Sequence, residues 1–397
     1  NSYMGSSLLM SDLNSDGYNE LLMGAYGDNS NQGAVFYDDY TSNEFYNSSN
    51  TNYKSGSGIA VGDFDGDGKQ DLAIGSPGYN SSQGVVYIYF NRMNSLNKGA
   101  LNLSIPDVTI TGHATGDQFG YSLSAGKVSN TQDNIDDLVV GAPGYDGSDY
   151  TDAGGVYEFD GKASCSASYA DADTAATNVI KYMSASSSCG FSVLVGKFAN
   201  KGQISNSTNI GGRDHIAYGC PTADGGTNYG YVFFVWNDGS LTTGYDDYFG
   251  AANPNYYIGM SLAKGDFNRD GTIDIAAGGY GTNNTTGGVY IAYNDGNYGS
   301  YQDVAIGGGD SGAKFGTAVV GVDYDADGDD DIVVGGPLYN STWGKLYFFN
   351  NDGSWPATAD FSIIASQSNT YLGQGLAAGD LNYDGRADIA IGAQYGV

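Results

Sequence analysis

Positively charged residues are scarce in this chain, and long apolar segments are missing. Of its 397 residues, 15 are Lys or Arg and 45 are Asp or Glu, so the formal net charge is −30. A nucleic-acid-binding protein needs the opposite sign of charge, and an anionic membrane surface would repel this chain. No apolar run approaches the roughly 20 residues of a membrane-spanning helix. We therefore expect no nucleic-acid partner and no direct membrane insertion.

Residues that commonly carry catalysis are also few. The two histidines are His113, in a Gly-rich connection, and His215, at the start of an apolar strand. No Ser-His-Asp or zinc-binding constellation is recognisable around them. A pair of carboxylates could act as acid and base on a glycan, but the aspartates are largely explained by the loops described below. We expect that the protein is not an enzyme.

Cysteine occurs three times, as Cys165, Cys189 and Cys220. An odd count forbids complete intramolecular pairing. We predict a Cys165–Cys189 disulfide, which would close the segment before the fourth repeat outside the cell. Cys220 is expected to be a small buried residue.

Glycine, tyrosine and aspartate dominate instead. There are 63 Gly and 34 Tyr, while glutamate occurs only as Glu20, Glu44 and Glu158. Glycine shows no Gly-X-Y period, which excludes collagen, and the 40% hydrophobic content excludes general disorder. Asp favours turns and oxygen-ligand loops, whereas Tyr, Val, Ile and Thr favour strands. This composition predicts an all-β protein with Asp-rich turns.

One segment recurs along the whole chain. Seven copies begin near residues 4, 55, 119, 189, 258, 315 and 372. In the second copy, strands are predicted at Gly58–Val61, Leu72–Ile74, Val85–Phe90 and Val108–Thr111. Short antiparallel strands in sevenfold repetition indicate a seven-bladed β-propeller of four-stranded blades, forming one domain over residues 1–397. A linear β-solenoid is the alternative.

The seventh copy is incomplete in this sequence. Gly396-Val397 matches Gly84-Val85, where the third strand of the second copy begins. The last blade is therefore expected to lack its outer two strands, which would leave backbone groups unpaired at its edge. A segment of the natural chain beyond Val397 or before Asn1, or a strand from a neighbouring molecule, is expected to cover this edge.

Five copies contain a nine-residue loop with oxygen-bearing side chains at alternate positions. Glycine at the sixth position permits a sharp turn, the seventh residue can offer its carbonyl, and an acid ends the loop. The residues at positions one, three, five, seven and nine are Asp12, Asn14, Asp16, Tyr18 and Glu20; Asp63, Asp65, Asp67, Lys69 and Asp71; Asp266, Asn268, Asp270, Thr272 and Asp274; Asp323, Asp325, Asp327, Asp329 and Asp331; and Asp380, Asn382, Asp384, Arg386 and Asp388.

Such a loop presents six or seven oxygens to a hard cation, and this number suits Ca²⁺ better than Mg²⁺. Asp and Asn also favour turns without any metal. Five loops in register, each leading into an apolar strand, favour the metal interpretation, so we predict about five Ca²⁺ ions. The third and fourth copies have Lys127 and Lys197 at the first position. An ammonium there would replace a cation, and we predict no calcium in these two copies.

The motifs around the loops resemble a known family. Phe119-Gly120 and Phe315-Gly316 precede the loop position, and Gly141-Ala142-Pro143 follows it. This frame resembles the FG-GAP repeats of integrin α-subunit propellers over essentially the whole chain. The resemblance implies a seven-bladed propeller with calcium in the hairpin between the first two strands of a blade. It also implies an extracellular setting, and adhesion or ligand recognition rather than catalysis.

Several asparagines precede x-Ser or x-Thr and are candidate glycosylation sites. They are Asn47, Asn80, Asn102, Asn206, Asn283, Asn284 and Asn340. Asn80, Asn283 and Asn340 occupy equivalent turns between the second and third strands of their copies. Because the calcium loops join the first and second strands, we expect these turns on the opposite face of the propeller.

The sequence thus predicts a secreted or cell-surface, calcium-binding adhesion or recognition module. Its expected partners are a protein or glycan ligand, or copies of itself. Because the third and fourth copies carry longer turns without this sequon, we expect any recognition site on the calcium-free face to lie over them. One alternative is a structural subunit of a surface layer or extracellular filament. Another is a carbohydrate-binding or carbohydrate-cleaving propeller, since the many tyrosines could stack on sugars.

Overall fold

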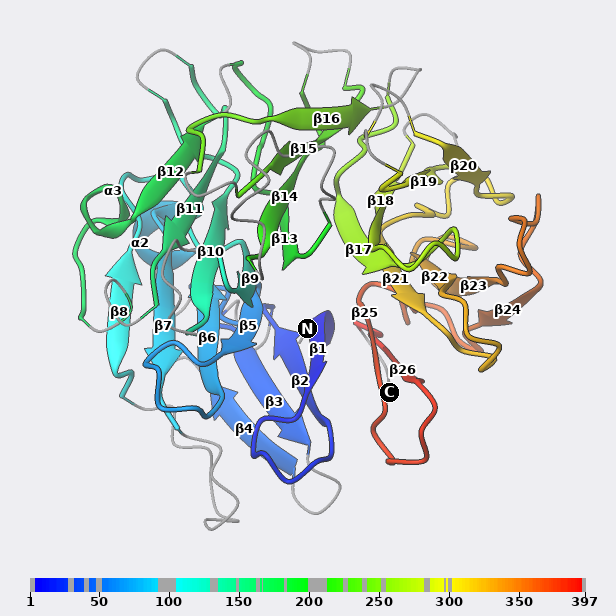
Figure 1. Ribbon diagram of the computed structural model, residues 1–397, viewed down its shortest axis with the longest axis horizontal. Helices are drawn as coiled ribbons and strands as arrows, with labels where there is room; N and C mark the ends of the chain where they lie inside the picture. Colours follow the sequence, from blue (N-terminus) through cyan, green and yellow to red (C-terminus); the bar gives the residue numbers. More distant parts are fainter. Residues whose placement is uncertain are drawn as a thin grey trace.

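The computed structural model is a ring of small antiparallel β-sheets around a central axis (Figure 1). It describes residues 4–27, 32–38, 43–47, 52–91, 105–128, 135–147, 150–161, 165, 167–181, 184–198, 213–223, 228–237, 241–250, 255–281, 286–295, 298 and 302–394, without the side chains of 43–47. Within each sheet, neighbouring strands follow one another in the chain. This up-and-down order is that of a β-propeller blade.

Six sheets have four strands each, and we call them blades 1 to 6 in chain order. Their strands are β1 Met4–Ser11, β2 Glu20–Ala25, β3 Ala34–Asp38 and β4 Asn43–Asn47; β5 Ile59–Gly62, β6 Asp71–Ser76, β7 Val85–Tyr89 and β8 Val108–Thr111; β9 Ser122–Gly126, β10 Asp137–Ala142, β11 Gly155–Phe159 and β12 Asn178–Lys181; β13 Ser192–Gly196, β14 His215–Cys220, β15 Tyr231–Val235 and β16 Asp247–Gly250; β17 Ser261–Gly265, β18 Asp274–Gly279, β19 Gly288–Ala292 and β20 Val304–Gly307; β21 Ala318–Val322, β22 Asp331–Gly336, β23 Lys345–Phe349 and β24 Phe361–Ile364.

In the part of the chain that it describes, the structure has six four-stranded blades and not the predicted seven, whose last blade was expected to lack its outer two strands. The seventh repeat contributes a two-stranded sheet, β25 (Leu376–Gly379) and β26 (Asp388–Ile391). No third strand pairs with β26 among the described residues. On the neighbouring blade 6, Phe361, Ile363 and Ile364 of β24 are 44–48% exposed. The reason is that the two-stranded sheet is too narrow to cover the outer part of blade 6.

The core lies between the sheets. In blades 2 to 6 every residue of the second strand is buried. Apolar clusters fill each gap from blade 1 to the two-stranded sheet, and Phe64, Phe159, Phe234 and Phe315 are completely buried in them. A single sheet of this kind exposes two apolar faces, so the blades are stable only when stacked.

Each repeat has two glycine landmarks, the Phe-Gly position at or just before the start of the first strand and the Gly-Ala-Pro position at the end of the second strand, and their glycines lie very close to one another between blades. A Cβ atom added at Gly219 of blade 4 would overlap the carbonyl oxygen of Gly259, which begins the blade 5 repeat. The same overlap recurs around the ring, and a Cβ at Gly392 of the last sheet would overlap the Gly5 carbonyl of blade 1. Gly259 and Gly5 also have positive φ angles, which side-chain-bearing residues rarely adopt. The ring therefore closes between the last sheet and blade 1.

Serine hydroxyls add a second link between blades at the same level. Ser7 Oγ donates to Gly56 O at 2.6 Å, and Ser192 Oγ donates to Gly259 O at 2.7 Å. Ser122 and Ser261 make the equivalent bonds. Blade 2 has Gly58 at the position of these serines, so this bond cannot form between blades 2 and 3.

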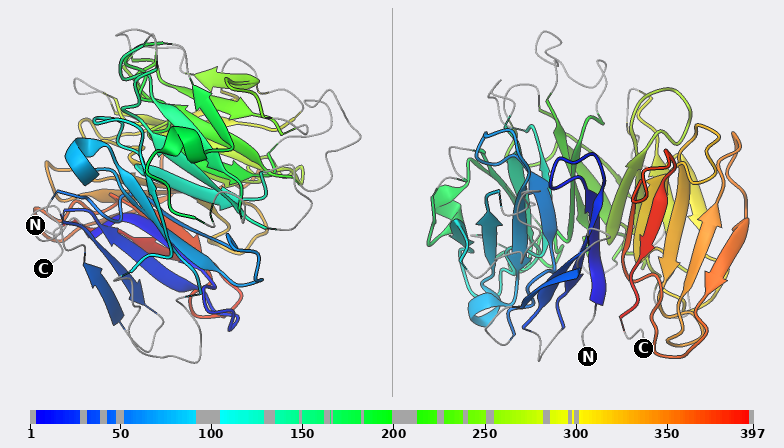
Figure 2. Two further views of the ribbon diagram at one scale, coloured as in Figure 1. Left: turned by 90° about the vertical axis from the view of Figure 1, so that its left-hand side faces the viewer. Right: turned by 90° about the horizontal axis from the view of Figure 1, so that it is seen from below.

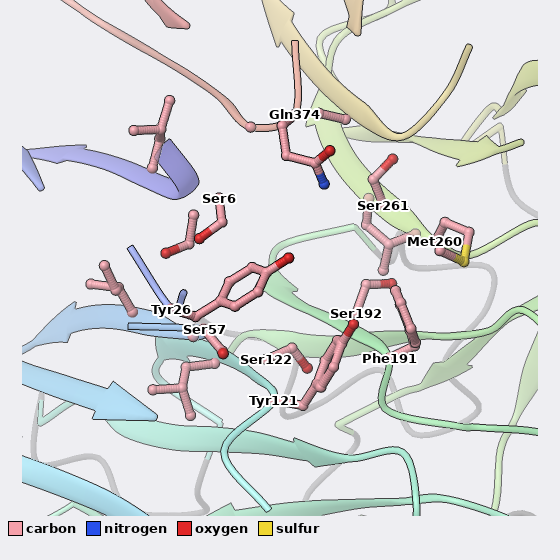
Figure 3. Close-up of a pocket in the computed structure, with 18 of the residues that line it drawn as sticks. Ser6, Tyr26, Ser57, Tyr121, Ser122, Phe191, Ser192, Met260, Ser261 and Gln374 are labelled. Carbon is pink, nitrogen blue, oxygen red and sulfur yellow. The ribbon is translucent and has the colours of Figure 1, made fainter. Parts of the chain in front are cut away.

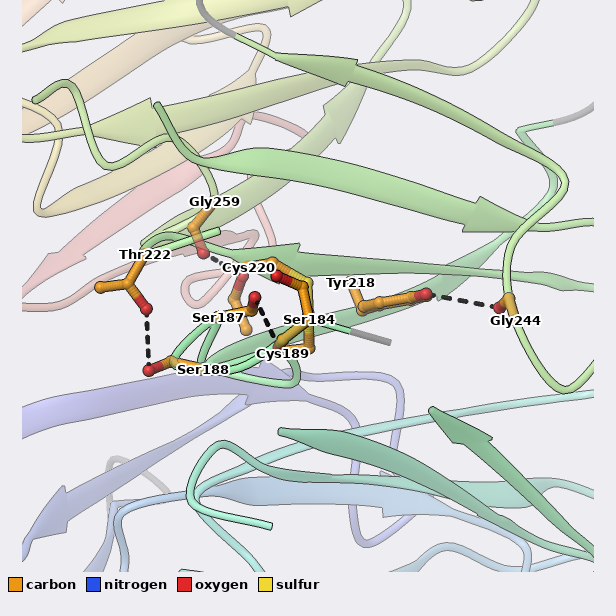
Figure 4. The surroundings of a disulfide bond; sticks show 10 residues. Ser184, Ser187, Ser188, Cys189, Tyr218, Cys220, Thr222, Gly244 and Gly259 are labelled. Carbon is orange, nitrogen blue, oxygen red and sulfur yellow. Dashed lines mark hydrogen bonds between the residues drawn. A yellow bond between two sulfur atoms is a disulfide. The ribbon is translucent and has the colours of Figure 1, made fainter. Parts of the chain in front are cut away.

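The disulfide joins Cys189 to Cys220, so the predicted Cys165–Cys189 pairing is wrong (Figure 4). Cys189 precedes Gly190 at the first landmark of blade 4, and Cys220 follows Gly219 at the second. These landmarks are adjacent within a blade, since Gly190 N donates to Gly219 O at 3.1 Å. The two Cα atoms are 4.0 Å apart. Cys165 is a free, buried thiol packed between blades 2 and 3.

Helical structure is short in the described chain. The elements are α2 (Tyr79–Ser82), in the β6–β7 turn, and α3 (Ala172–Ala175), between β11 and β12. Neither α2 nor α3 has the length that crossing a bilayer requires, and the described residues contain no longer apolar helix. Because α2 and the loop before β6 lie at opposite ends of β6, they lie on opposite faces of the ring (Figure 2).

Candidate functional site

The five predicted metal loops share one backbone conformation. Each joins the first and second strands of its sheet, as between β5 and β6. The sixth-position glycines, such as Gly68 and Gly271, have positive φ angles in all five loops. So do the fourth-position residues, which are Ser15, Gly66, Arg269, Ala326 and Tyr383. The sequence pattern predicted the glycine requirement but not the second left-handed residue, since four different residue types occupy it in addition to glycine.

Hydrogen bonds fold each loop around its acidic side chains. We number each loop by its repeat, so the five loops are loops 1, 2, 5, 6 and 7. In loop 2, Asp63 Oδ1 accepts from Asp67 N at 3.0 Å and its Oδ2 accepts from Gly68 N at 2.9 Å. Asp65 Oδ1 accepts from Asp67 N at 3.0 Å, and Asp67 Oδ1 accepts from Lys69 N at 2.9 Å. The same four bonds occur in the loops that begin at Asp12, Asp266, Asp323 and Asp380.

Carboxylate oxygens converge inside the loops. Oxygens of three acids lie within 4.8 Å of one another in three loops: Asp12, Asp16 and Glu20; Asp63, Asp65 and Asp71; and Asp323, Asp325 and Asp331. The loops that begin at Asp12, Asp266 and Asp380 have Asn14, Asn268 and Asn382 at the third position, so an amide oxygen replaces one carboxylate there. A donor set made only of oxygens at this spacing fits a hard cation with bonds of roughly 2.3–2.6 Å.

Four of the five ninth-position acids are buried, and burial shifts their ionisation; Asp388 is half-buried. Asp71 is 1% exposed, Glu20 is 2% exposed, and Asp274 and Asp331 are fully buried. Burial raises the pKa of Glu20, Asp71 and Asp274 to about 7, and that of Asp331 to about 6. Neighbouring loop carboxylates raise these pKa values further, so a bound cation would relieve an unfavourable concentration of negative charge.

The ninth position also has a structural role in every blade from 2 to 6. Asp71 Oδ1 accepts from Asn91 N at 3.0 Å, just after the third strand, and Asp137 Oδ1 accepts from Gly161 N at 2.8 Å. In blade 4 this place is taken by His215, whose Nδ1 accepts from Asn237 N at 2.9 Å. Burial lowers the pKa of His215 to about 4, so it is neutral. A neutral acceptor thus suffices in a blade without the acidic loop.

Two loops contain a basic side chain close to the acids. Lys69 Nζ is 2.9 Å from Asp67 Oδ2 within loop 2. Arg269 of loop 5 reaches the neighbouring loop 6, where its guanidinium contacts Asp327 at 3.3 Å and also pairs with Asp329. In loops 2 and 6 a cation at the centre would therefore compete with a basic group for one fifth-position oxygen.

A cavity of about 450 Å³ lies on the ring axis at the other end of the first strands. Its lining combines aromatic and hydroxyl side chains, and Figure 3 shows Tyr26 and Gln374 pointing towards its middle. Tyr121 and Phe191, which precede the first strands of blades 3 and 4, have ring centroids 4.7 Å apart. This cavity is on the face opposite the acidic loops, because β1 runs from Ser6 beside the cavity to Asp12 in loop 1.

Two candidate glycosylation sites, Asn80 and Asn340, are exposed in equivalent turns on the cavity face. The side chain of Asn47 and all of Asn102, Asn206, Asn283 and Asn284 lie outside the described residues. His113, which the sequence placed in an uninformative connection, lies beside Asp171 and Asp173. No local motif signals this cluster, because 58 residues separate His113 from Asp171.

The fold and the loops define the class of this protein as a β-propeller with a ring of acidic, oxygen-rich loops on one face. Comparison with known families agrees with this description. The FG-GAP repeat model matches residues 4–37 and 55–89, and the FG-GAP-like repeat model matches residues 323–391. The chain thus contains FG-GAP repeats in a β-propeller that resembles integrin α-subunits, as its motifs predicted.

Individual relatives match over part of the chain. Integrin alpha-IIb of Homo sapiens is 30% identical over 192 residues, covering 44% of this chain and 18% of that protein. Integrin alpha-5 of Xenopus laevis is 30% identical over 149 residues, covering 35% of this chain and 14% of that protein. Phosphatidylinositol-glycan-specific phospholipase D of Bos taurus is 32% identical over 162 residues, covering 35% of this chain and 18% of that protein. The chain thus spans less than a fifth of the length of these relatives.

Proposed function

We propose that this chain is an extracellular or cell-surface recognition module, stabilised by about five Ca²⁺ ions, that binds a protein or glycan ligand without catalysis. The proposal treats residues 1–397 as one propeller domain. Its main support is the arrangement of two faces: acidic loops at one end of the first strands and an aromatic-lined cavity at the other. The resemblance to integrin α-subunits supports the adhesion role.

The proposed calcium ligands are the oxygens at positions one, three, five, seven and nine of the five loops. The four buried ninth-position acids support this assignment. Burial, together with neighbouring carboxylates, raises the pKa of Asp71 and Asp274 to about 7, and a divalent ion would offset the buried negative charge. Bound calcium would supply electrostatic stabilisation of the hairpins and no chemical step. Asn80 and Asn340 are proposed glycosylation sites, because both are exposed on equivalent turns.

The ligand is proposed to bind at the cavity mouth beside blades 3 and 4. Tyr121 and Phe191 are the aromatic side chains of these two blades in the cavity lining. Tyr150, in the β10–β11 turn of blade 3, is 37% exposed on the same face. Aromatic rings surrounded by hydroxyl groups suit both a protein side chain and a sugar ring.

The test is a binding screen against a printed glycan array and a panel of immobilised extracellular-matrix proteins, in calcium and in chelator. We expect Phe191→Ala and Tyr150→Ala to reduce binding of the selected ligand by about tenfold or more, as for hot-spot aromatics. The matched control is Tyr383→Ala, which removes a 62% exposed tyrosine from the opposite face. Unchanged binding by both cavity-face variants would place the site elsewhere.

A structural subunit is the second candidate function. The exposed apolar side chains of β24 favour it, because they lie beside the narrow two-stranded sheet and could bury area against another copy. Electron microscopy of the protein in calcium distinguishes the two candidates. Lattices or filaments whose contacts include β24, with no binding in the screen, would favour the structural role over recognition.

A further inference from the structure

A second, chemically different group of potential metal ligands lies on the outer side of blades 2 and 3. His113 follows β8 of blade 2, while Asp171 and Asp173 lie at the start of α3. His113 Nδ1 is 3.1 and 3.3 Å from the two carboxylate oxygens of Asp171, and 4.0 Å from Asp173 Oδ2. One ligand atom from each residue lies within 4.8 Å of the others.

The segment that carries the two aspartates is fixed against blade 2 by backbone pairing. Tyr169 N donates to Thr109 O at 2.7 Å, and Thr111 N donates to Tyr169 O at 3.0 Å. Residues 168–170 therefore extend the outer edge of blade 2 beyond β8, although they belong to the blade 3 repeat. This pairing brings α3 to the end of β8, where the chain continues to His113.

Buried tyrosines orient one of the carboxylates. Tyr157, fully buried in the core, donates its hydroxyl to Asp173 Oδ1 at 2.7 Å, and Tyr145 OH lies 3.4 Å from Asp173 Oδ2. Asp171 Oδ1 accepts from Asp173 N at 2.9 Å. Hydrogen bonds of this kind to the remaining oxygens of a ligand are the usual outer support of a metal site.

Negative charge is in excess around the single imidazole. Asp117, which is 2% exposed, belongs to the same surroundings, and burial raises its pKa to about 6. The carboxylates of Asp171 and Asp173 both lie within 4.0 Å of the His113 imidazole. Lys181 Nζ lies over the Tyr145 ring, 5.0 Å from its centroid, and not against the carboxylates of Asp171 or Asp173 in the described residues. The cluster therefore favours an added positive charge.

We propose that His113 Nδ1 and the carboxylates of Asp171 and Asp173 form a Zn²⁺ site. This site would fasten the segment between β11 and β12 of blade 3 to the outer edge of blade 2. Bonds of about 2.0–2.1 Å in a tetrahedral site place ligand atoms roughly 3.3 Å apart, close to the observed 3.1–4.0 Å. One nitrogen with carboxylate oxygens suits Zn²⁺, whereas Ca²⁺ takes oxygen ligands only. Zinc would replace the proton shared by His113 and Asp171, and water would complete the coordination.

The test is calorimetric titration of the metal-stripped protein with ZnCl₂ in excess CaCl₂, so that calcium occupies the acidic loops. We expect one equivalent of Zn²⁺ for the wild-type chain and affinity weakened by more than about tenfold in His113→Gln and Asp171→Asn. Asn can still cap α3, so the second variant preserves the helix. Asp295→Asn, an exposed acid of blade 5, is the matched control and should bind zinc as the wild type does.

Two further measurements make the result decisive. X-ray absorption at the zinc edge should show one imidazole among nitrogen and oxygen ligands, and the zinc-free variants should melt within a few degrees of the wild type in calcium. Undiminished zinc binding by His113→Gln would assign the metal to the acidic loops and overturn the proposal. Absence of any zinc binding would leave His113 and Asp171 as a simple ion pair and overturn it equally.

Discussion

At the scale of single residues, the ninth loop position has two roles that the sequence pattern does not distinguish. It accepts a backbone hydrogen bond within the blade, and in the acidic loops it also provides a buried negative charge. Asp274 and His215 both accept the backbone N–H that follows the third strand of their blades. Only Asp274 belongs to an acidic loop, and only it adds a buried negative charge. The hydrogen bond therefore stabilises the blade, while the charge belongs to the proposed metal.

Replacing Asp274 with Asn should separate these two roles. In chelator at pH 7.5 we expect the variant to melt above the wild type, because a carboxylate with a pKa near 7 is unfavourably ionised there. The shift from 3.8 to about 7 corresponds to at most about 4 kcal/mol. In calcium the order should reverse. Differential scanning fluorimetry measures both, with Asp295→Asn as control, and equal melting temperatures in chelator would contradict the argument.

The other prediction for a single residue concerns acid sensitivity. The pKa of His215 falls from an ordinary 6.5 to about 4 in the folded protein. The unfolded chain therefore binds a proton between pH 6.5 and 4 that the folded chain does not, and stability falls as the pH falls through this range. The loss is up to about 3 kcal/mol. In His215→Asn, which keeps an acceptor, we expect a smaller loss in urea unfolding between pH 7 and 4.5.

His113→Gln is the control for this experiment, because the pKa of His113 is raised and its contribution has the opposite sign. Identical pH profiles for the wild type and His215→Asn would show that His215 does not titrate as its burial requires.

At the scale of the elements, strands and the acidic loops between them were predictable because their signals are local. β8 has the predicted bounds Val108–Thr111, and the five loops lie where their spacing placed them. The disulfide was not predictable, because Cys189 and Cys220 meet only through the pairing of two repeat landmarks. The contact of His113 with α3 was missed because it also depends on residues that are distant in the sequence. The segment between β11 and β12 of blade 3 lies against the outer edge of blade 2, where His113 follows β8.

The landmark glycines give the sharpest prediction for an element. Gly219→Ala should be destabilising by several kcal/mol, as for overpacking, because its Cβ would overlap Gly259 O of the next blade. Ser192→Ala should cost about 1 kcal/mol, since it removes one hydrogen bond to the same carbonyl. Gly244→Ala in the same blade is the control, with no atom within 4 Å of the added Cβ. Similar denaturation midpoints for both glycine variants would refute this account of the interface.

At the scale of the whole molecule, closure of the ring gathers the negatively charged loops on one face. The glycine contact between Gly392 and Gly5 completes a ring whose acidic loops lie on one face, in a chain of net charge −30. Five divalent ions would add ten positive charges and leave −20. The repeat count predicted this ring, but the two-stranded form of its last sheet left β24 more exposed than a complete neighbour would.

Calcium should therefore control the stability of the whole ring. Elemental analysis after gel filtration should find about five Ca²⁺ per chain, and strong chelator should lower the melting temperature, because a ligand of the folded state alone stabilises it. Tyr18 and Tyr383, whose rings are 4.8 Å apart between loops 1 and 7, should sensitise Tb³⁺ emission. A stoichiometry near zero with an unchanged melting curve in chelator would disprove the calcium assignment.

The pairing of residues 168–170 with the edge of blade 2 also affects how the protein is synthesised. Thr109 leaves the ribosome 59 residues before Ser168, its later partner. At about 5–20 residues per second, β8 waits roughly 3–12 s with an open edge. Exposed edges are templates for pairing with other chains. Nascent chains stalled within blade 3 should therefore be the ones that associate wrongly with one another.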